Sequence, residues 1–129
     1  MLEKLNVGVI GVGFIGELHA RIYSEINNTN LVAVVDINEQ KGREIAGRYN
    51  CSYYPNMEEL FTRSDIDAVS ICLPDTLRLE PVLQAAEAGK HILLEKPIAR
   101  SVEEAERIKK VAEQNGIRLM VAHVMRFDP

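Results

Sequence analysis

The stretch "GVIGVGFIGELH", residues Gly8–His19, decides the fold of this chain. It contains Gly11, Gly13 and Gly16 in the order GxGxxG, and it overlaps the end of an apolar run, Leu5–Ile10, that predicts a strand. In such a loop the first glycine permits a tight turn, the second lets the backbone approach a pyrophosphate, and the third lets helix and strand pack closely. The alternative is a turn whose glycines serve packing alone, because a lone GxGxxG is a weak signal.

A helix is predicted directly after this loop. Ile15, Leu18, Ile22 and Ile26 recur at helical spacing, which predicts an apolar face on that helix. The N–H groups at a helix start lack intrahelical partners and carry positive potential, so they attract phosphate. We therefore expect Phe14 and Ile15, together with the three glycines, to bind the phosphates of a dinucleotide.

An acidic residue at the end of the second apolar run supports this interpretation. Asp36 follows the run Leu31–Val35 and lies about 20 residues after Gly16, where an acid accepts hydrogen bonds from the ribose hydroxyls of a dinucleotide. A carboxylate there would repel the 2′-phosphate of NADP, so the sequence favours NAD over NADP as cofactor. Lys41 and Arg43, on the next predicted helix, could partly compensate that repulsion.

Short β-branched runs alternate with segments of helical period along the whole chain. This alternation is typical of βαβ units wound into a parallel sheet. We expect an α/β fold with a doubly wound parallel sheet and helices on both faces, in three layers. The predicted strands cover residues 5–10, 31–35, 52–54, 67–73, 91–94 and 117–125, and the longer predicted helices include residues 39–49 and one that begins after Ser101.

Helix ends and helix faces can be predicted in the same way. Asn56 with Glu59, and Ser101 with Glu104, have the spacing of capping boxes, and Gly89 suits the residue after a helix end. Two helix faces are predicted to pack on the sheet: Gly42, Ile45, Ala46 and Tyr49 in one helix, and Val102, Ala105, Ile108 and Ala112 in another.

The composition is that of an ordinary globular domain. The 129 residues are 47% hydrophobic and 26% charged, with a formal net charge of -4 and no broad cluster of Lys and Arg, which argues against nucleic acid as a partner. Cys51 and Cys72 have no metal-ligand spacing to a histidine, so we expect no metal site and two reduced, structural thiols in the cytoplasm. The run Val7–Ile15 lacks the features of a signal peptide, and no run is long enough to span a membrane.

The sequence is predicted to form one dinucleotide-binding domain, residues 1–129. In proteins with a doubly wound nucleotide-binding domain, a substrate domain commonly follows at a place like the closing "RFDP". We therefore expect a second, substrate-binding domain after residue 129. The alternative is that the protein ends here.

Another stretch, "HILLEKPIAR" from His91 to Arg100, is a strand-like run that ends abruptly in Glu95, Lys96 and Pro97. Ligands of open α/β sheets bind at the carboxyl ends of the strands. Glu95 and Lys96 lie at such an end, and Pro74, His123 and Arg126 follow or lie near the ends of other predicted strands. These residues are predicted to converge on one crevice.

In these motifs the chain resembles the N-terminal domain of the glucose-fructose oxidoreductase and inositol dehydrogenase family. The resemblance covers essentially the whole chain: GxGxxG followed by His19, the strand ending in Asp36, Pro74 after "ICL", "AGKHILLEKP" and "RFDP". It implies a Rossmann fold and a nicotinamide-dependent dehydrogenase that acts on a sugar, cyclitol or related polyol. It also implies that the full-length protein takes its general base and most substrate contacts from a second domain, whose sheet commonly pairs copies into a homo-oligomer.

The resemblance also implies roles for individual residues. Lys96 would lie beside the nicotinamide ring and the substrate carbon as the catalytic residue, hydrogen-bonding a substrate hydroxyl as hydride leaves. Glu95 would help place the nicotinamide and fix the lysine, and Pro97 would hold the loop in one path, with a cis or a trans bond. Leu73 and Pro74, after the fourth main strand, complete the expected cofactor-binding set.

One position departs from the family pattern. Relatives commonly have a histidine four residues after Pro74, where this chain has Arg78. Arg78 could bind a carboxylate or phosphate, but a solvated arginine at a helix start is the favoured interpretation. Pro81 then falls inside the apparent helix, so that helix is predicted to begin near Leu79 or to kink.

Three further residues keep open alternatives. His19 is expected to be a structural histidine, hydrogen-bonded to a neighbouring backbone group, rather than a ligand contact. His123 either packs in the core or lines the crevice. Arg126 either contacts cofactor or substrate or is a surface residue.

Two other functions compete with the dehydrogenase. One is a non-catalytic module that binds NAD(H) and reports its redox state to a partner. The other is a nucleotide-binding fold for S-adenosylmethionine, which is disfavoured because methyl transfer gives no reason for Lys96.

Overall fold

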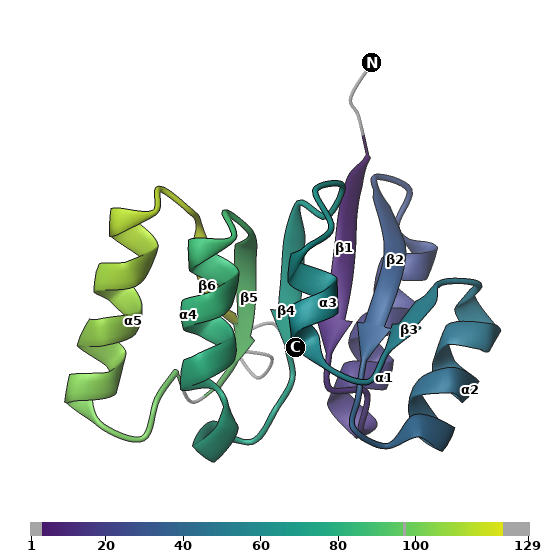
Figure 1. The fold of residues 1–129 in the computed structure, drawn as a ribbon, viewed down its shortest axis with the longest axis horizontal. Coiled ribbons are helices and arrows are strands. Elements are labelled where there is room, and N and C mark those ends of the chain that lie inside the picture. Colours follow the sequence, from purple (N-terminus) through teal and green to yellow (C-terminus); the bar gives the residue numbers. More distant parts are fainter. Residues whose placement is uncertain (1–3, 97, 123–129) are drawn as a thin grey trace, which may run out of the picture.

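In the computed structural model, which describes residues 4–96 and 98–122, the strands pair in parallel into one six-stranded sheet in the order β3-β2-β1-β4-β5-β6 (Figure 1). The strands are β1 Leu5–Ile10, β2 Thr29–Val35, β3 Ser52–Tyr54, β4 Ala68–Ile71, β5 His91–Glu95 and β6 Leu119–Ala122. The helices are α1 Phe14–Glu25, α2 Glu39–Tyr49, α3 Met57–Phe61, α4 Leu79–Glu87 and α5 Val102–Gln114, with a 3₁₀ turn, η1, at Asp75–Leu77.

Helices cover both faces of the sheet (Figure 1). Helices α1 and α2 pack together on one face, and α3, α4 and α5 lie on the other. The chain runs outward from β1 to β3 and then returns to the middle at β4, so the strand order reverses between β1 and β4. Loops after β1 and β4 separate at such a reversal, which is where doubly wound sheets bind their ligands.

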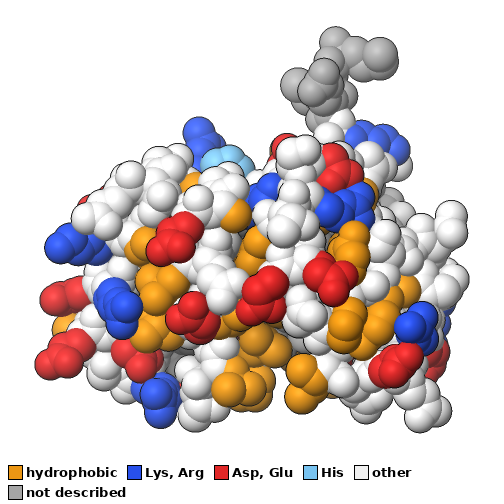
Figure 2. Space-filling view, in the orientation of Figure 1, with side chains coloured by type: hydrophobic (Ala, Val, Ile, Leu, Met, Phe, Trp, Pro, Cys, Tyr) orange, Lys and Arg blue, Asp and Glu red, His pale blue; other side chains and the backbone are white. Residues whose placement is uncertain are grey.

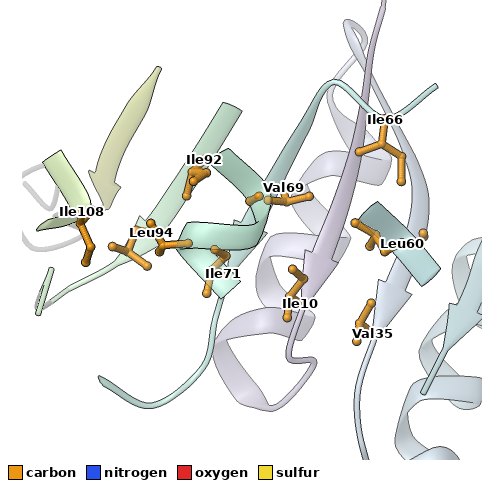
Figure 3. Close-up of a cluster of buried hydrophobic side chains, with 12 residues drawn as sticks. Ile10, Val35, Leu60, Ile66, Val69, Ile71, Ile92, Leu94 and Ile108 are labelled. Carbon is orange, nitrogen blue, oxygen red and sulfur yellow. The ribbon is translucent and has the colours of Figure 1, made fainter. Parts of the chain in front are cut away.

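Two clusters of buried side chains hold the three layers together. Successive side chains of a strand point to opposite faces, so Val9 of β1 packs with α1 and α2 while its neighbour Ile10 packs on the other side. Figure 3 shows the larger cluster, in which Ile71, Leu94 and Ile108 bring two strands and α5 together. Strands buried on both faces explain why the sequence reads as continuous apolar runs rather than as alternating ones.

The predicted fold class is confirmed, and most elements lie where the sequence places them. The strand predicted at residues 67–73 is shorter than expected, since β4 covers only Ala68–Ile71. The last strand begins at Leu119 rather than Ile117, and residues 123–125 lie outside the described part of the chain. Pro81 falls in the first turn of α4, which begins at Leu79 as predicted, because a missing N–H costs nothing there.

The predicted face of α1 is wrong. Its buried residues are Gly16 and Ala20, whereas Ile15, Ile22 and Ile26 remain 38%, 41% and 40% exposed. Gly16 lies directly against the backbone of Gly11, and Ala20 belongs to the buried cluster that contains Val9 of β1, so small side chains face the sheet. The isoleucines lie to the side of that contact, so helical spacing alone identified a helix but not its buried face.

The other helix predictions hold better. In α2, Gly42, Ile45 and Ala46 are buried as expected. Ile108 and Ala112 of α5 are buried too, but the prediction for Val102 is wrong, because this first residue of the helix is 74% exposed. Asn56 and Ser101 cap α3 and α5 by accepting hydrogen bonds from the backbone N–H groups of Glu59 and Glu104.

Candidate functional site

The glycine loop after β1 is held in place by a left-handed residue. Gly11 has φ +88°, and a β-carbon there would lie 2.8 Å from the carbonyl oxygen of Cys72 and 2.9 Å from a methyl group of Leu73. Its N–H group donates to the carbonyl oxygen of Val35 at 2.8 Å. Only glycine suits this position, and the loop consequently packs directly on the segment that follows β4.

The other two glycines of the motif differ in what they contact. A β-carbon at Gly16 would lie 1.7 Å from the carbonyl oxygen of Gly11, so the loop can fold back over α1 only with glycine there. Among the residues that the structure describes, no atom lies within 4 Å of a β-carbon placed at Gly13. This helix start thus has open space at the position where a pyrophosphate would approach the backbone.

Asp36 connects the end of β2 to the glycine loop. One carboxylate oxygen accepts a hydrogen bond from the N–H of Val12 at 2.8 Å, and the other accepts from the N–H of Asn38 at 2.8 Å. Tyr53 donates its hydroxyl hydrogen to the Asp36 carbonyl at 2.8 Å. Each carboxylate oxygen retains lone pairs beyond these bonds, so Asp36 can fix the loop and still accept from a diol.

A cavity of about 270 Å³ opens beside Asp36 and Gly11. Its apolar lining includes Ile10 and Val35 from the strand ends, Met57 from α3, and Leu73 and Leu77 from the segment after β4. Figure 2 shows hydrophobic side chains along the lower edge of the molecule, the edge to which the strand arrowheads point in Figure 1. Asp36 and Glu58 add carboxylates to the lining. A concave, largely apolar site with a few polar groups suits a flat aromatic base that carries a sugar.

Three exposed apolar side chains follow the strand ends along this edge. Phe14 comes after β1, Ile37 after β2 and Leu77 after β4, with exposed fractions of 87%, 94% and 58%. Pro74, predicted to belong to the cofactor-binding set, precedes η1 and starts the turn that carries Leu77.

Glu95 ends β5 and is almost fully buried. Its carboxylate lies 2.8 Å from Nε2 of His19, whose Nδ1 lies 3.0 Å from the hydroxyl of Ser70. The hydroxyl of Tyr23 also bonds Ser70. These four side chains form one hydrogen-bonded series from α1 through β4 to β5. His19 is thus hydrogen-bonded within the fold, although its partners are side chains rather than the backbone group expected.

This series lies in a poorly hydrated environment. Burial raises the pKa of the Tyr23 hydroxyl, partly offset by its hydrogen bond with Ser70. Burial also raises the pKa of the Cys72 thiol to about 12, and the negative charge of Glu95 adds to the effect. The Cys51 thiol has a pKa raised to about 11 by burial. Both free thiols are therefore protonated at neutral pH.

Lys96 directly follows Glu95, and its side chain is exposed at the carboxyl edge of the sheet. The glycine loop and Lys96 both lie at this edge, since β4 pairs with β1 on one side and with β5 on the other. Pro97, His123 and Arg126 lie outside the described residues.

The prediction of a solvated Arg78 is wrong, because only 6% of this residue is exposed. Its Nε donates to the carbonyl oxygen of Leu73 at 2.7 Å, and its terminal nitrogens donate to the carbonyl oxygens of Glu95 and Lys96. Burial lowers the pKa of this guanidinium, while the charges of Asp75 and Glu95 act in the opposite direction. Backbone carbonyl groups from two segments thus take the place of water as hydrogen-bond partners of the guanidinium.

The last two residues of the "AGKH" motif, Lys90 and His91, have structural roles at the edge of the sheet opposite the crevice. Lys90 is 6% exposed and donates from Nζ to the carbonyl oxygen of Arg63 at 2.6 Å. His91 accepts a hydrogen bond from the N–H of Arg118 through Nδ1 at 3.0 Å. These residues precede or begin β5, so they fix the strand that carries Glu95 and Lys96 and do not reach the crevice.

Residues 4–96 and 98–122 contain no group of three or more His, Cys, Asp or Glu side chains that could hold a metal ion. Over the same residues, the helices are all too short or too polar to cross a bilayer.

Comparison with known proteins agrees with this arrangement. Residues 5–123 match the model of an oxidoreductase family with an NAD-binding Rossmann fold. Inositol 2-dehydrogenase of Rhizobium meliloti is 37% identical over 125 residues, which are 97% of this chain and 38% of that protein. The chain thus spans well under half the length of this relative.

Two solved structures have the same fold over 98% of the chain. Scyllo-inositol dehydrogenase of Lactobacillus casei, with bound NAD(H) and scyllo-inositol, superposes with a TM-score of 0.91 at 26% identity, and the match covers 38% of it. An oxidoreductase of Desulfitobacterium hafniense named as NADPH-dependent has a TM-score of 0.91 at 33% identity, and 36% of it is covered.

Proposed function

This chain belongs to the glucose-fructose oxidoreductase and inositol dehydrogenase family, and we propose that it is the NAD-binding part of a dehydrogenase that oxidises a sugar, cyclitol or related polyol. Members of the family are nicotinamide-dependent oxidoreductases. The observation that carries the proposal is the joining of Asp36 to the glycine loop, beside an open Gly13 and an apolar cavity.

The residues present fit a dinucleotide in three places. The α1 start, with the N–H groups of Phe14 and Ile15 and no side chain at Gly13, would hold the pyrophosphate. Asp36 would accept hydrogen bonds from the ribose hydroxyls. The apolar cavity would take the adenine, and the loop after β4, with Leu73 and Pro74, leads from it toward Lys96.

We propose NAD rather than NADP because the nearby cations are already paired. Lys41 lies 2.8 Å from a carboxylate oxygen of Glu17, and Arg43 lies 2.8 Å from one of Glu39. A 2′-phosphate would have to compete with these carboxylates for both cations, and it would face the negative charge of Asp36. The competition for the cations and the repulsion by Asp36 both favour a cofactor with a free 2′-hydroxyl, which is NAD.

In the reaction, the nicotinamide ring of bound NAD would accept the hydride. Lys96 is the residue of this chain proposed to act on the substrate. Its ammonium would donate a hydrogen bond to the substrate hydroxyl and stabilise negative charge on that oxygen as hydride leaves. Glu95 and Pro97 would support the lysine and the nicotinamide end of the site.

The rest of the protein is proposed to supply what this chain does not. A substrate-binding domain after residue 129 would contribute the general base and most contacts to the polyol, and it would join copies into a homo-oligomer. We place the protein in the cytoplasm, on the strength of its two free thiols.

A substitution at Asp36 tests the cofactor assignment. Asp36→Ala removes the ribose acceptor and the bond to Val12, so we expect NADH affinity to fall by about a hundredfold, while NADPH affinity falls less. Calorimetric titration with both cofactors measures the two changes.

Asp67 offers a matched control at the opposite edge of the sheet. Its carboxylate accepts a backbone N–H bond from Asn6 at 2.8 Å, the same length as the bond from Val12 to Asp36, so Asp67→Ala loses a contact of the same kind. NADH affinity should stay within about twofold in that variant. Equal losses in the two variants, or an unchanged preference between NADH and NADPH in Asp36→Ala, would contradict the assignment.

A further inference from the structure

Arg78 is buried at a position where the surrounding sequence predicts an exposed side chain. It lies between η1 and α4, where an arginine would ordinarily extend into water, yet the residue is 6% exposed. Removing a guanidinium from water costs free energy unless its hydrogen-bond donors are satisfied. Its hydrogen-bond partners include three backbone carbonyl oxygens: that of Leu73 after β4, and those of Glu95 and Lys96 at the end of β5.

The pattern of these bonds is specific to one residue, Lys96. The carbonyl of Glu95 belongs to the peptide group before the Lys96 α-carbon, and the carbonyl of Lys96 belongs to the group after it. A guanidinium that holds both oxygens restricts rotation about both backbone bonds of Lys96, because its donors have a rigid planar geometry. The direction in which the lysine side chain leaves the backbone is thereby restricted.

The third bond ties this loop to the cofactor side of the crevice. Leu73 accepts from Nε of Arg78, and its side chain would touch a β-carbon at Gly11. The glycine loop, the segment after β4 and the Lys96 backbone thus form a continuous series of contacts. Independently, His19 holds the side chain of Glu95 from the α1 face.

We propose that Arg78 is a positioning residue that fixes Lys96 relative to the glycine loop by binding the carbonyl groups on both sides of it. The proposal rests on the proposed function of Lys96 only for its catalytic consequence. Lysine cannot replace Arg78 in this role, since one ammonium nitrogen cannot span three carbonyls with a planar fork.

The first test needs no cofactor. Backbone ¹⁵N relaxation of the protein should give an order parameter of about 0.85 at Lys96, and this value should fall below about 0.6 in Arg78→Met and in Arg78→Lys. Gly13 should keep its value in both variants. Arg78→Lys retains the positive charge, so the measurement can be made on this variant if Arg78→Met does not fold.

Arg100→Met is the matched control. Arg100 lies just beyond the same loop, and its ion pair with Glu104, at 3.3 Å, is exposed. The order parameter at Lys96 should not change in this variant. A rigid Lys96 in a folded Arg78 variant would overturn the proposal, and so would an equal loss of order at Gly13.

The second test separates the nicotinamide end from the rest of the cofactor. ADP-ribose lacks the nicotinamide ring, and Arg78 holds the backbone of both Glu95 and Lys96 at the proposed nicotinamide end of the site. Because Glu95 as well as Lys96 would be displaced, Arg78→Met should weaken NADH binding by about fivefold or more and change ADP-ribose binding by less than about twofold. Equal losses for the two ligands would overturn the positioning role. Failure of the wild-type protein to bind either ligand would contradict the proposed function instead, and the relaxation measurement would still decide the role of Arg78.

Discussion

Replacing Gly16 with alanine is expected to destabilise the fold by about 3 kcal/mol or more and to abolish NADH binding. The new methyl group would lie 1.7 Å from the carbonyl oxygen of Gly11, and this neighbour is backbone, which cannot move aside as a side chain does. The loop would have to leave α1, and the N–H of Val12 would then lose its bond to Asp36. Urea unfolding and titration with NADH measure the two effects.

Substitutions at two other glycines distinguish effects on packing from effects on ligand binding. Gly47 is an exposed residue of α2 with free space for a β-carbon, so Gly47→Ala should raise stability by about 1 kcal/mol and leave NADH binding unchanged. Gly13→Ala should cost at most about 1 kcal/mol of stability, because alanine is a poorer N-cap residue than glycine, yet it should weaken NADH binding, because its methyl group would point into the proposed phosphate site. A stable Gly16→Ala variant that binds NADH normally would contradict the role given to the loop.

Replacing Lys96 with alanine in the full-length protein is expected to lower hydride transfer by about a thousandfold and to change NADH affinity only about twofold. Lys96 is exposed, so its loss should cost little stability. The effect is large because the ammonium would act on the substrate oxygen only as charge develops there. The measurement is NADH formation with a panel of polyols and sugars, beginning with myo-inositol and scyllo-inositol.

Lys110→Ala, at an exposed position of α5, is the control and should turn over at the wild-type rate. The same experiment decides between the dehydrogenase and a module that only senses NAD(H). Unchanged hydride transfer in Lys96→Ala would remove the lysine from the mechanism. A full-length protein that binds NADH but oxidises no member of the panel would favour the sensing module.

Much of the fold follows from the sequence because local signals and tertiary structure agree. The strand Leu5–Ile10 and the helix Glu39–Tyr49 have the predicted bounds, since the left-handed Gly11 follows the strand and Asn38 and Asn50 cap the two ends of the helix. The buried face of α1 could not be predicted from periodicity, because it is formed by the small residues Gly16 and Ala20 rather than by the isoleucines.

The candidate site was predictable only in part. Gly11 and Asp36 were found because both belong to a local motif whose spacing reflects one βαβ unit. The burial of Arg78 was missed, since the carbonyl oxygens of Glu95 and Lys96 come from a strand end that is distant in sequence. The hydrogen bond between His19 and Glu95 likewise joins residues that are distant in the sequence, and no residue spacing predicts it. The departure from histidine at Arg78 was the one available signal.

Titration of the wild-type chain with NADH and with NADPH, followed by cofactor fluorescence, tests the central claim most directly. We expect saturable binding of both cofactors, with NADH bound about tenfold more tightly or better, because Asp36 accepts from a free ribose and repels a phosphate. Tighter binding of NADPH, or no saturable binding of NADH at millimolar concentrations, would contradict the claim that this glycine loop and Asp36 form an NAD site.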